Sequence, residues 1–162
     1  MGHGIEVDAE GARFAYSSSS RQMPWHRLGH SVRGLGTVEE MLAAARADFD
    51  VVTTGVAAVD ADGNFILNPD GKPVTIGDSR ATVRVNPDGT FTGLSTVGTR
   101  YVVQQNREVL ERAFAIVGAS THIRDGAVID TCGVLDGGKE FFAAIDLGSI
   151  YLDPSGANDE IR

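Results

Sequence analysis

The sequence has little cysteine, few aromatic residues and no long hydrophobic run. Cys132 is the only cysteine among 162 residues, so no disulfide can form within the chain. No apolar run approaches the roughly 20 residues that span a bilayer. The first residues also lack the basic and then apolar pattern of a secretory leader. These absences predict a soluble protein of the reducing cytoplasm that has no membrane partner.

Positive charge is scarce as well. The chain has 14 Lys and Arg against 22 Asp and Glu, and its formal net charge is −8. A chain of this charge repels phosphate, so a broad basic face for duplex DNA is not expected. Most of the arginines are scattered, which is typical of a solvated surface.

A local group in the middle of the chain could still bind single-stranded nucleic acid, because such binding needs a stacking aromatic beside a cationic groove. The candidate residues are Arg80, Arg84, Arg100, Tyr101 and Gln105. The amide of Gln105 could read a base edge. In the alternative interpretation it covers the end of a strand, and Asn106 caps the helix that follows.

Two helices are predicted. The first begins at Thr37, which forms a capping box with Glu40 and is followed by an amphipathic segment ending near Asp48. The second begins at Asn106 and ends at Gly118. Its predicted apolar stripe consists of Val109, Leu110, Ala113, Phe114 and Val117.

The segments between and after these helices indicate strands. Residues 49–105 are rich in β-branched residues and contain the turn sequences DADG and, twice, NPDG, so they predict an antiparallel meander. Residues 80–85 alternate, which places Ala81, Val83 and Val85 on one face and the arginines on the other. A further hairpin is expected around the Asp136-Gly137-Gly138 turn.

The predicted fold is therefore α+β: a curved, mainly antiparallel sheet built from hairpins, with about two helices packed on it. Residues 1–23 are expected to be an N-terminal arm and residues 24–150 a single domain. Residues 151–162 are expected to be a tail or the start of a missing C-terminal half.

The segment MPWHRLGHSV contains the chain's only Trp and two of its four His. His26 and His30 have the spacing of two zinc ligands on a helix, but Pro24 and Gly29 predict a loop, and no third ligand lies nearby. No metal or cofactor is therefore expected. The favoured interpretation is a structural anchor made by Trp25, His26, Leu28, Gly29 and Asn106. Cys132, in a predicted strand, is interpreted as a small buried hydrophobe and not as a nucleophile served by His122.

Three segments in order, PWHRLGHSV, YVVQQNREVLERAF and GVLDGGKEFFAAIDL, resemble the phage/plasmid-like proteins that carry a conserved domain of unknown function. The matching positions are Trp25, His26, Leu28, Gly29, Tyr101, Gln105, Asn106, Gly133, Leu135 and Gly138. The resemblance implies a setting in phages, prophages and plasmids and carries over no catalytic residue. Family members usually continue with a second half, which this chain lacks.

Three functions are compatible with these observations. The first is a non-enzymatic accessory protein of phage or plasmid DNA metabolism that binds single-stranded nucleic acid, by analogy with annealing proteins. The second is an acidic protein-interaction or homo-oligomeric module, for example an inhibitor of a host factor, with a host or phage protein as partner. The third is a metal-dependent hydrolase that uses His26 and His30.

Overall fold

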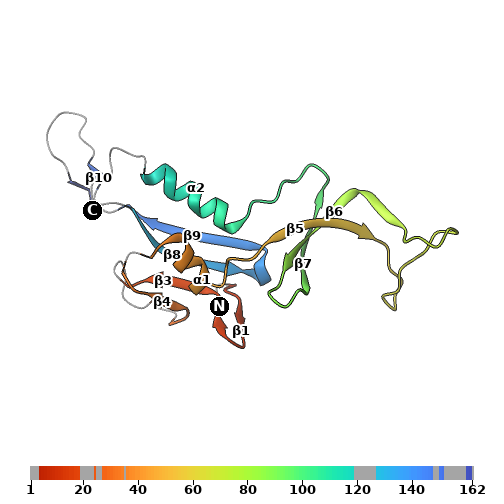
Figure 1. Ribbon diagram of the computed structural model, residues 1–162, viewed down its shortest axis with the longest axis horizontal. Helices are drawn as coiled ribbons and strands as arrows, with labels where there is room; N and C mark the ends of the chain where they lie inside the picture. The colour runs from red at the N-terminus through yellow and green to blue at the C-terminus, as the bar shows by residue number, and fades with distance from the viewer. Residues whose placement is uncertain are drawn as a thin grey trace. The chain divides into compact units, whose positions relative to one another are not determined.

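A computed structural model describes residues 4–18, 24, 27–34, 36–118, 127–147, 150–151 and 160–161 (Figure 1). It confirms the predicted α+β class with mainly antiparallel strands. The chain divides into two compact units: unit 1 comprises Met1–Asp48 and Asn106–Arg162, and unit 2 comprises Phe49–Gln105. Among the described residues, no helix is both long and apolar enough to cross a membrane.

Unit 1 contains a four-stranded sheet in the order β4 (His30–Val32), β3 (Phe14–Ser17), β8 (Val128–Leu135) and β9 (Glu140–Asp146). The β3 and β4 strands are parallel, and the other neighbours are antiparallel. The short η1 helix (Asp136–Gly138) joins β8 to β9, so the predicted C-terminal hairpin is confirmed.

The segment expected to be an N-terminal arm contributes an interior strand of this sheet. All four residues of β3 are buried, and the Phe14 ring stacks on Phe142 of β9 with 5.9 Å between ring centroids. A strand that is buried on both faces shows no polar alternation, which is why the sequence pattern did not place this segment inside the sheet. Two further antiparallel pairs, β1 (Val7–Asp8) with β2 (Gly11–Ala12) and β10 (Ile150–Tyr151) with β11 (Glu160–Ile161), lie outside the sheet.

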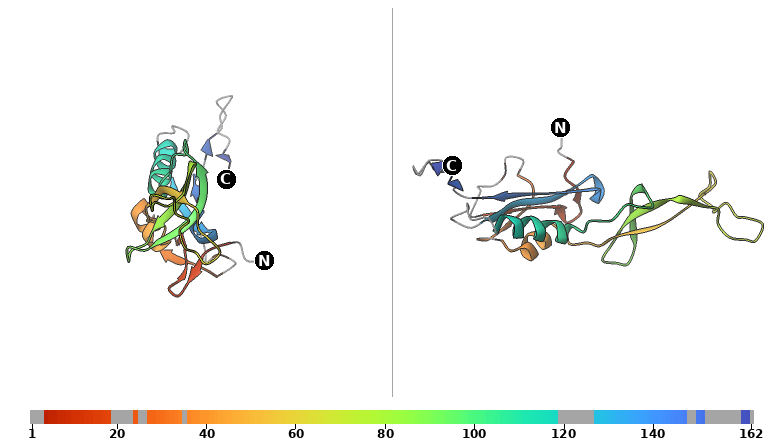
Figure 2. Two further views of the ribbon diagram at one scale, coloured as in Figure 1. Left: turned by 90° about the vertical axis from the view of Figure 1, so that its right-hand side faces the viewer. Right: turned by 90° about the horizontal axis from the view of Figure 1, so that it is seen from above.

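Both predicted helices are present, and they cover one side of the sheet (Figure 2). The α1 helix (Val38–Ala44) has the expected capping box between Thr37 and Glu40, and it packs on β3, β4 and β8 through its buried Met41 and Leu42. The α2 helix (Asn106–Gly118) packs on β9 and α1, with Leu110 buried. Of its predicted apolar stripe, Val109 is exposed.

Unit 2 is the predicted antiparallel meander of β5 (Val51–Ala57), β6 (Thr75–Val85) and β7 (Phe91–Gly98), with β6 in the middle. Its turns repeat one geometry at 60–63, 68–71 and 86–89. In each turn the glycine N–H donates to the carbonyl of the first residue, at 2.9–3.1 Å, and the glycine φ lies between 79° and 84°. This is a type I turn closed by a left-handed glycine, as the DADG and NPDG sequences predict.

The two ends of unit 2 leave unit 1 at adjacent points. The side-chain amide of Asn106 donates to the carbonyl of Ala47 at 2.8 Å. Next to it, Arg107 forms an ion pair with Asp48 at 2.7 Å. These two contacts fasten the start of α2 to the residues that end the first part of unit 1.

Candidate functional site

All five residues predicted to contact nucleic acid lie in unit 2, and the structure uses the two β6 arginines inside the fold. Arg84 is 8% exposed, its guanidinium lies 5.2 Å from the centroid of the Phe49 ring, and its Nε donates to Asn86 Oδ1 at 3.1 Å. Arg80 is half-buried, and its Nη1 donates to the Ser79 carbonyl at 3.1 Å. The guanidinium of Arg84 therefore has little surface left for a phosphate.

Gln105 contacts the backbone of its own sheet. The Val51 N–H donates to Gln105 Oε1 at 3.0 Å, and Gln105 Nε2 donates to the Val51 carbonyl at 2.8 Å. The side-chain amide thus pairs with the N–H and the carbonyl of Val51, as a residue of a neighbouring strand would. It covers the beginning of β5, as the strand-end interpretation predicts. Because β5 and β7 are opposite edges of the sheet, residues 99–105 must cross it between β7 and this contact.

Arg100 and Tyr101 remain at the surface. Both are exposed, and Tyr101 is about half accessible. They are consecutive residues in the segment that follows β7, so a cation and an aromatic ring are both accessible in this segment. Of the five predicted residues, these two are the exposed ones.

The predicted anchor residues are distributed as follows. Trp25 and His26 lie outside the described residues, and Leu28 is partly exposed. Gly29 has φ +100°, and a Cβ at this position would lie 2.3 Å from Phe14 Cδ1 and 2.7 Å from the Phe14 carbonyl oxygen. Gly29 therefore allows the chain before β4 to touch β3, and Asn106 fastens α2 as described above.

The residues considered for metal binding or nucleophilic catalysis have other surroundings. His30 is exposed and belongs to the strand β4, not to a helix, and His26 lies outside the described residues. In the described parts of the chain, no three His, Cys, Asp or Glu side chains are grouped as metal ligands. Cys132 is fully buried, its Sγ lies 3.4 Å from the Met41 carbonyl oxygen, and burial raises the pKa of its thiol to about 12. Such a thiol is a poor nucleophile at neutral pH.

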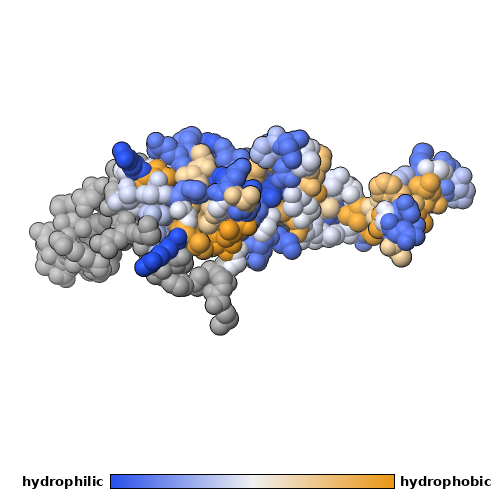
Figure 3. All heavy atoms as spheres, turned by 90° about the horizontal axis from the view of Figure 1, so that it is seen from below, coloured by the Kyte–Doolittle hydropathy of each residue, from blue (hydrophilic) through white to orange (hydrophobic). Residues whose placement is uncertain are grey.

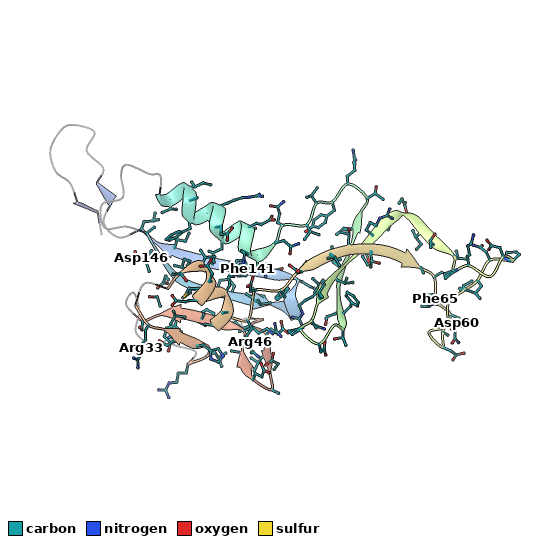
Figure 4. The ribbon with its side chains drawn as sticks, in the orientation of Figure 1. Arg33, Arg46, Asp60, Phe65, Phe141 and Asp146 are labelled. Atoms are coloured by element: carbon teal, nitrogen blue, oxygen red, sulfur yellow. The ribbon has the colours of Figure 1, made fainter. Side chains whose placement is uncertain are left out.

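A charge cluster that the sequence did not reveal fastens the β1–β2 hairpin to the end of α1 (Figure 4). Arg46 Nη1 contacts Asp8 at 2.6 Å and Glu10 at 2.9 Å, and its Nη2 donates to the Gly11 carbonyl. Arg13 also contacts Asp8, at 3.2 Å. The hydrogen bond from Arg46, together with the Glu10 N–H and Arg13, lowers the pKa of Asp8 from 3.8 to about 2.

The feature of unit 2 that the sequence did not predict is an exposed apolar sheet face. It is formed by Val52, Ala81, Val83, Val85 and Phe91 and is here called the open face. Val52 pairs with Val83, and Val85 pairs with Phe91, across neighbouring strands. Val52 is 40% exposed and Phe91 is 66% exposed, while the other three are half-buried.

The opposite face of the same sheet carries the buried residues of β6. These are Thr82 and Arg84, which are 5% and 8% exposed. The alternation of residues 80–85 thus identified the two faces correctly, but Thr82 and Arg84 are the residues that are buried, whereas Val52 and Phe91 on the valine face are exposed. One available signal was that no helix lies within 49–105, so the sheet has no partner of its own to cover the valines.

A second apolar surface lies beyond the main part of the sheet. Val59, Phe65 and Leu67, here called the distal strip, are each more than half exposed, and Val59 pairs with Phe65. Figure 4 labels Phe65 beside the turns, and Figure 3 shows hydrophobic surface next to hydrophilic turn residues at the same end of unit 2.

No family model, curated protein or solved structure matches this chain.

Proposed function

We propose that this chain is a non-enzymatic protein that acts by binding another protein through the open face of unit 2. The observation that carries the proposal is the lack of a core in this unit. In Phe49–Gln105, all of which is described, Leu94 is the one buried apolar side chain, whereas nine large hydrophobic side chains are exposed. A sheet becomes stable by burying one face against another layer.

The free energy available to a partner is substantial. Full burial of a Val or Phe side chain contributes roughly 1.5–3 kcal/mol relative to exposure. Covering Val52 and Phe91 alone would therefore contribute a few kcal/mol, and the three half-buried neighbours would add to it. This is the kind of exposed apolar area that marks a protein–protein contact.

The resemblance to phage/plasmid-like proteins supplies the setting of the proposal. In that setting, a chain of net charge −8 that exposes an uncharged apolar sheet is suited to binding a host protein, a phage protein or itself. The internal use of Arg80, Arg84 and Gln105 favours this function over nucleic-acid binding.

Site-specific photo-crosslinking tests the proposal. Benzoylphenylalanine is placed at Val52, on the open face, and in a matched control at Thr53, the next residue, which is exposed on the other face. Crosslinking is carried out in cells that produce the full chain, and the products are identified by mass spectrometry. We expect a discrete protein–protein product from position 52 and not from position 53. Products that contain nucleic acid, or crosslinks only within one chain, would overturn the proposal.

A second function, binding of single-stranded nucleic acid, is favoured by one observation. Arg100 and Tyr101 are consecutive exposed residues, and a cation near a stacking aromatic is suited to an unpaired base. Fluorescence anisotropy with oligonucleotides at low and high salt tests it. Binding that weakens with salt and is lost in Tyr101→Ala would support this function, and absence of binding at low salt would exclude it.

A further inference from the structure

We infer that the open face binds the same face of a second copy of this chain, which produces a two-layer sandwich of two β5–β6–β7 sheets. This inference rests on the proposed function, because it names the partner of the same surface. Packing of two sheets at a separation of about 10 Å is a common way to bury one face of each. The pairs Val52–Val83 and Val85–Phe91 would then form its interior.

The charge distribution favours a second copy over a partner selected by charge. Each chain has a net charge of −8, so two copies repel wherever their acidic surfaces meet. The open face, however, has no ionisable side chain among its five members. The nearest cations in sequence, Arg80 and Arg84, lie on the opposite face because residues alternate along β6. Two copies can therefore meet here without opposing like charges.

The size of the face predicts a reversible contact. Three strands about 4.8 Å apart, with about six residues of about 3.4 Å each, cover a flat area of roughly 300 Å². A stable interface usually buries about 800 Å² of accessible surface on each partner. The open face is less than half this size, so association should depend on protein concentration and be weak in dilute solution.

Sedimentation velocity of the full chain across the micromolar range tests the inference. We expect the sedimentation coefficient to rise with concentration for the unsubstituted chain. Phe91→Asp would place like charges opposite each other in the sandwich and should weaken association by about tenfold or more. The control is Phe65→Asp, which changes an equally exposed aromatic residue in the distal strip and should leave association unchanged.

Circular dichroism establishes that both variants are folded, and their exposed positions make this the expected result. A monomer at all concentrations would overturn the inference, as would equal loss of association in the two variants. If the chain is monomeric while position 52 still crosslinks to a different protein, the inference that a second copy binds the open face is wrong, and the proposed function stands. If neither association nor intermolecular crosslinking occurs, both are wrong.

The second test is chemical crosslinking between two copies of the chain through an introduced cysteine. It compares two variants that carry the cysteine at neighbouring positions. Thr54 and Thr53 are both exposed, and they lie on opposite faces of β5. The buried Cys132 does not compete with a cysteine introduced at the surface. A bismaleimide that spans the ~10 Å between packed sheets should join two copies of Thr54→Cys far faster than two copies of Thr53→Cys. Equal rates for the two variants would overturn the sandwich.

Discussion

Replacement of Gly29 by alanine tests how unit 1 is held together next to β4. The residue has φ +100°, and its backbone lies against Phe14, which is 4% exposed. A methyl group at this position would lie 2.3 Å from Phe14 Cδ1 and 2.7 Å from the Phe14 carbonyl oxygen. The ring could move only by disturbing its stack on Phe142, and the carbonyl belongs to the backbone of an interior strand.

The expected loss of stability has two parts. A positive φ costs a non-glycine residue roughly 1–3 kcal/mol. An additional methyl group in packed surroundings costs roughly 1–3 kcal/mol more. The sum is about 2–6 kcal/mol, which is a large part of the about 5–15 kcal/mol that stabilises an ordinary domain.

Gly34→Ala is the matched control for the cost of placing a methyl group in packed surroundings. Gly34 also has a positive φ, +72°, but a Cβ there would meet no atom within 4 Å. Urea unfolding followed by circular dichroism should therefore show a moderate loss for Gly34→Ala and a loss larger by about 1–3 kcal/mol for Gly29→Ala. Equal losses would refute the argument that close contact with Phe14 requires glycine at position 29.

Three further results are expected. Gln105→Ala removes both hydrogen bonds to Val51, so we expect the Val51 amide to lose most of its protection from hydrogen exchange. Unchanged protection would contradict the interpretation that Gln105 covers the end of β5. The folded pKa of Asp8 is about 2 and its ordinary pKa is 3.8, so the contact with Arg46 stabilises the chain above about pH 4 and is lost as the pH falls towards 2. Urea midpoints measured across this range should fall less in Asp8→Asn, and a parallel fall in both chains would contradict the assignment. Cys132 should react with iodoacetamide at neutral pH only when the chain unfolds, because its thiol is buried and its pKa is raised to about 12. Rapid labelling of the folded chain would contradict this prediction, because it would show that the thiol is accessible.

Local sequence signals predicted the regular elements well. The capping box of Thr37 and Glu40, the hairpin turns and the start of a helix at Asn106 were all readable, because each depends on neighbouring residues. The antiparallel meander followed from the turns. The α+β class followed from two amphipathic segments set among β-branched ones.

Long-range features were not readable in the same way. The position of β3 inside the sheet depends on its pairing with β8, more than a hundred residues away, and on a parallel contact with β4. The contacts of Arg46 with Asp8 and Glu10 also join distant parts of the chain. For β6, alternation separated the two faces, but it could not show which of them would be buried. Arg84, predicted to bind a ligand, is 8% exposed and lies against the Phe49 ring.

The fastening of Asn106 to Ala47, beside the ion pair of Arg107 with Asp48, has a consequence for the architecture of the gene product. Unit 2 begins after Asp48 and ends before Asn106, and these two points are held next to each other, so the meander is an insertion within the sequence of unit 1. We expect substitutions, insertions or deletions within unit 2 to leave the sheet and helices of unit 1 paired as before. Unit 2 can therefore vary in sequence while unit 1 keeps its structure.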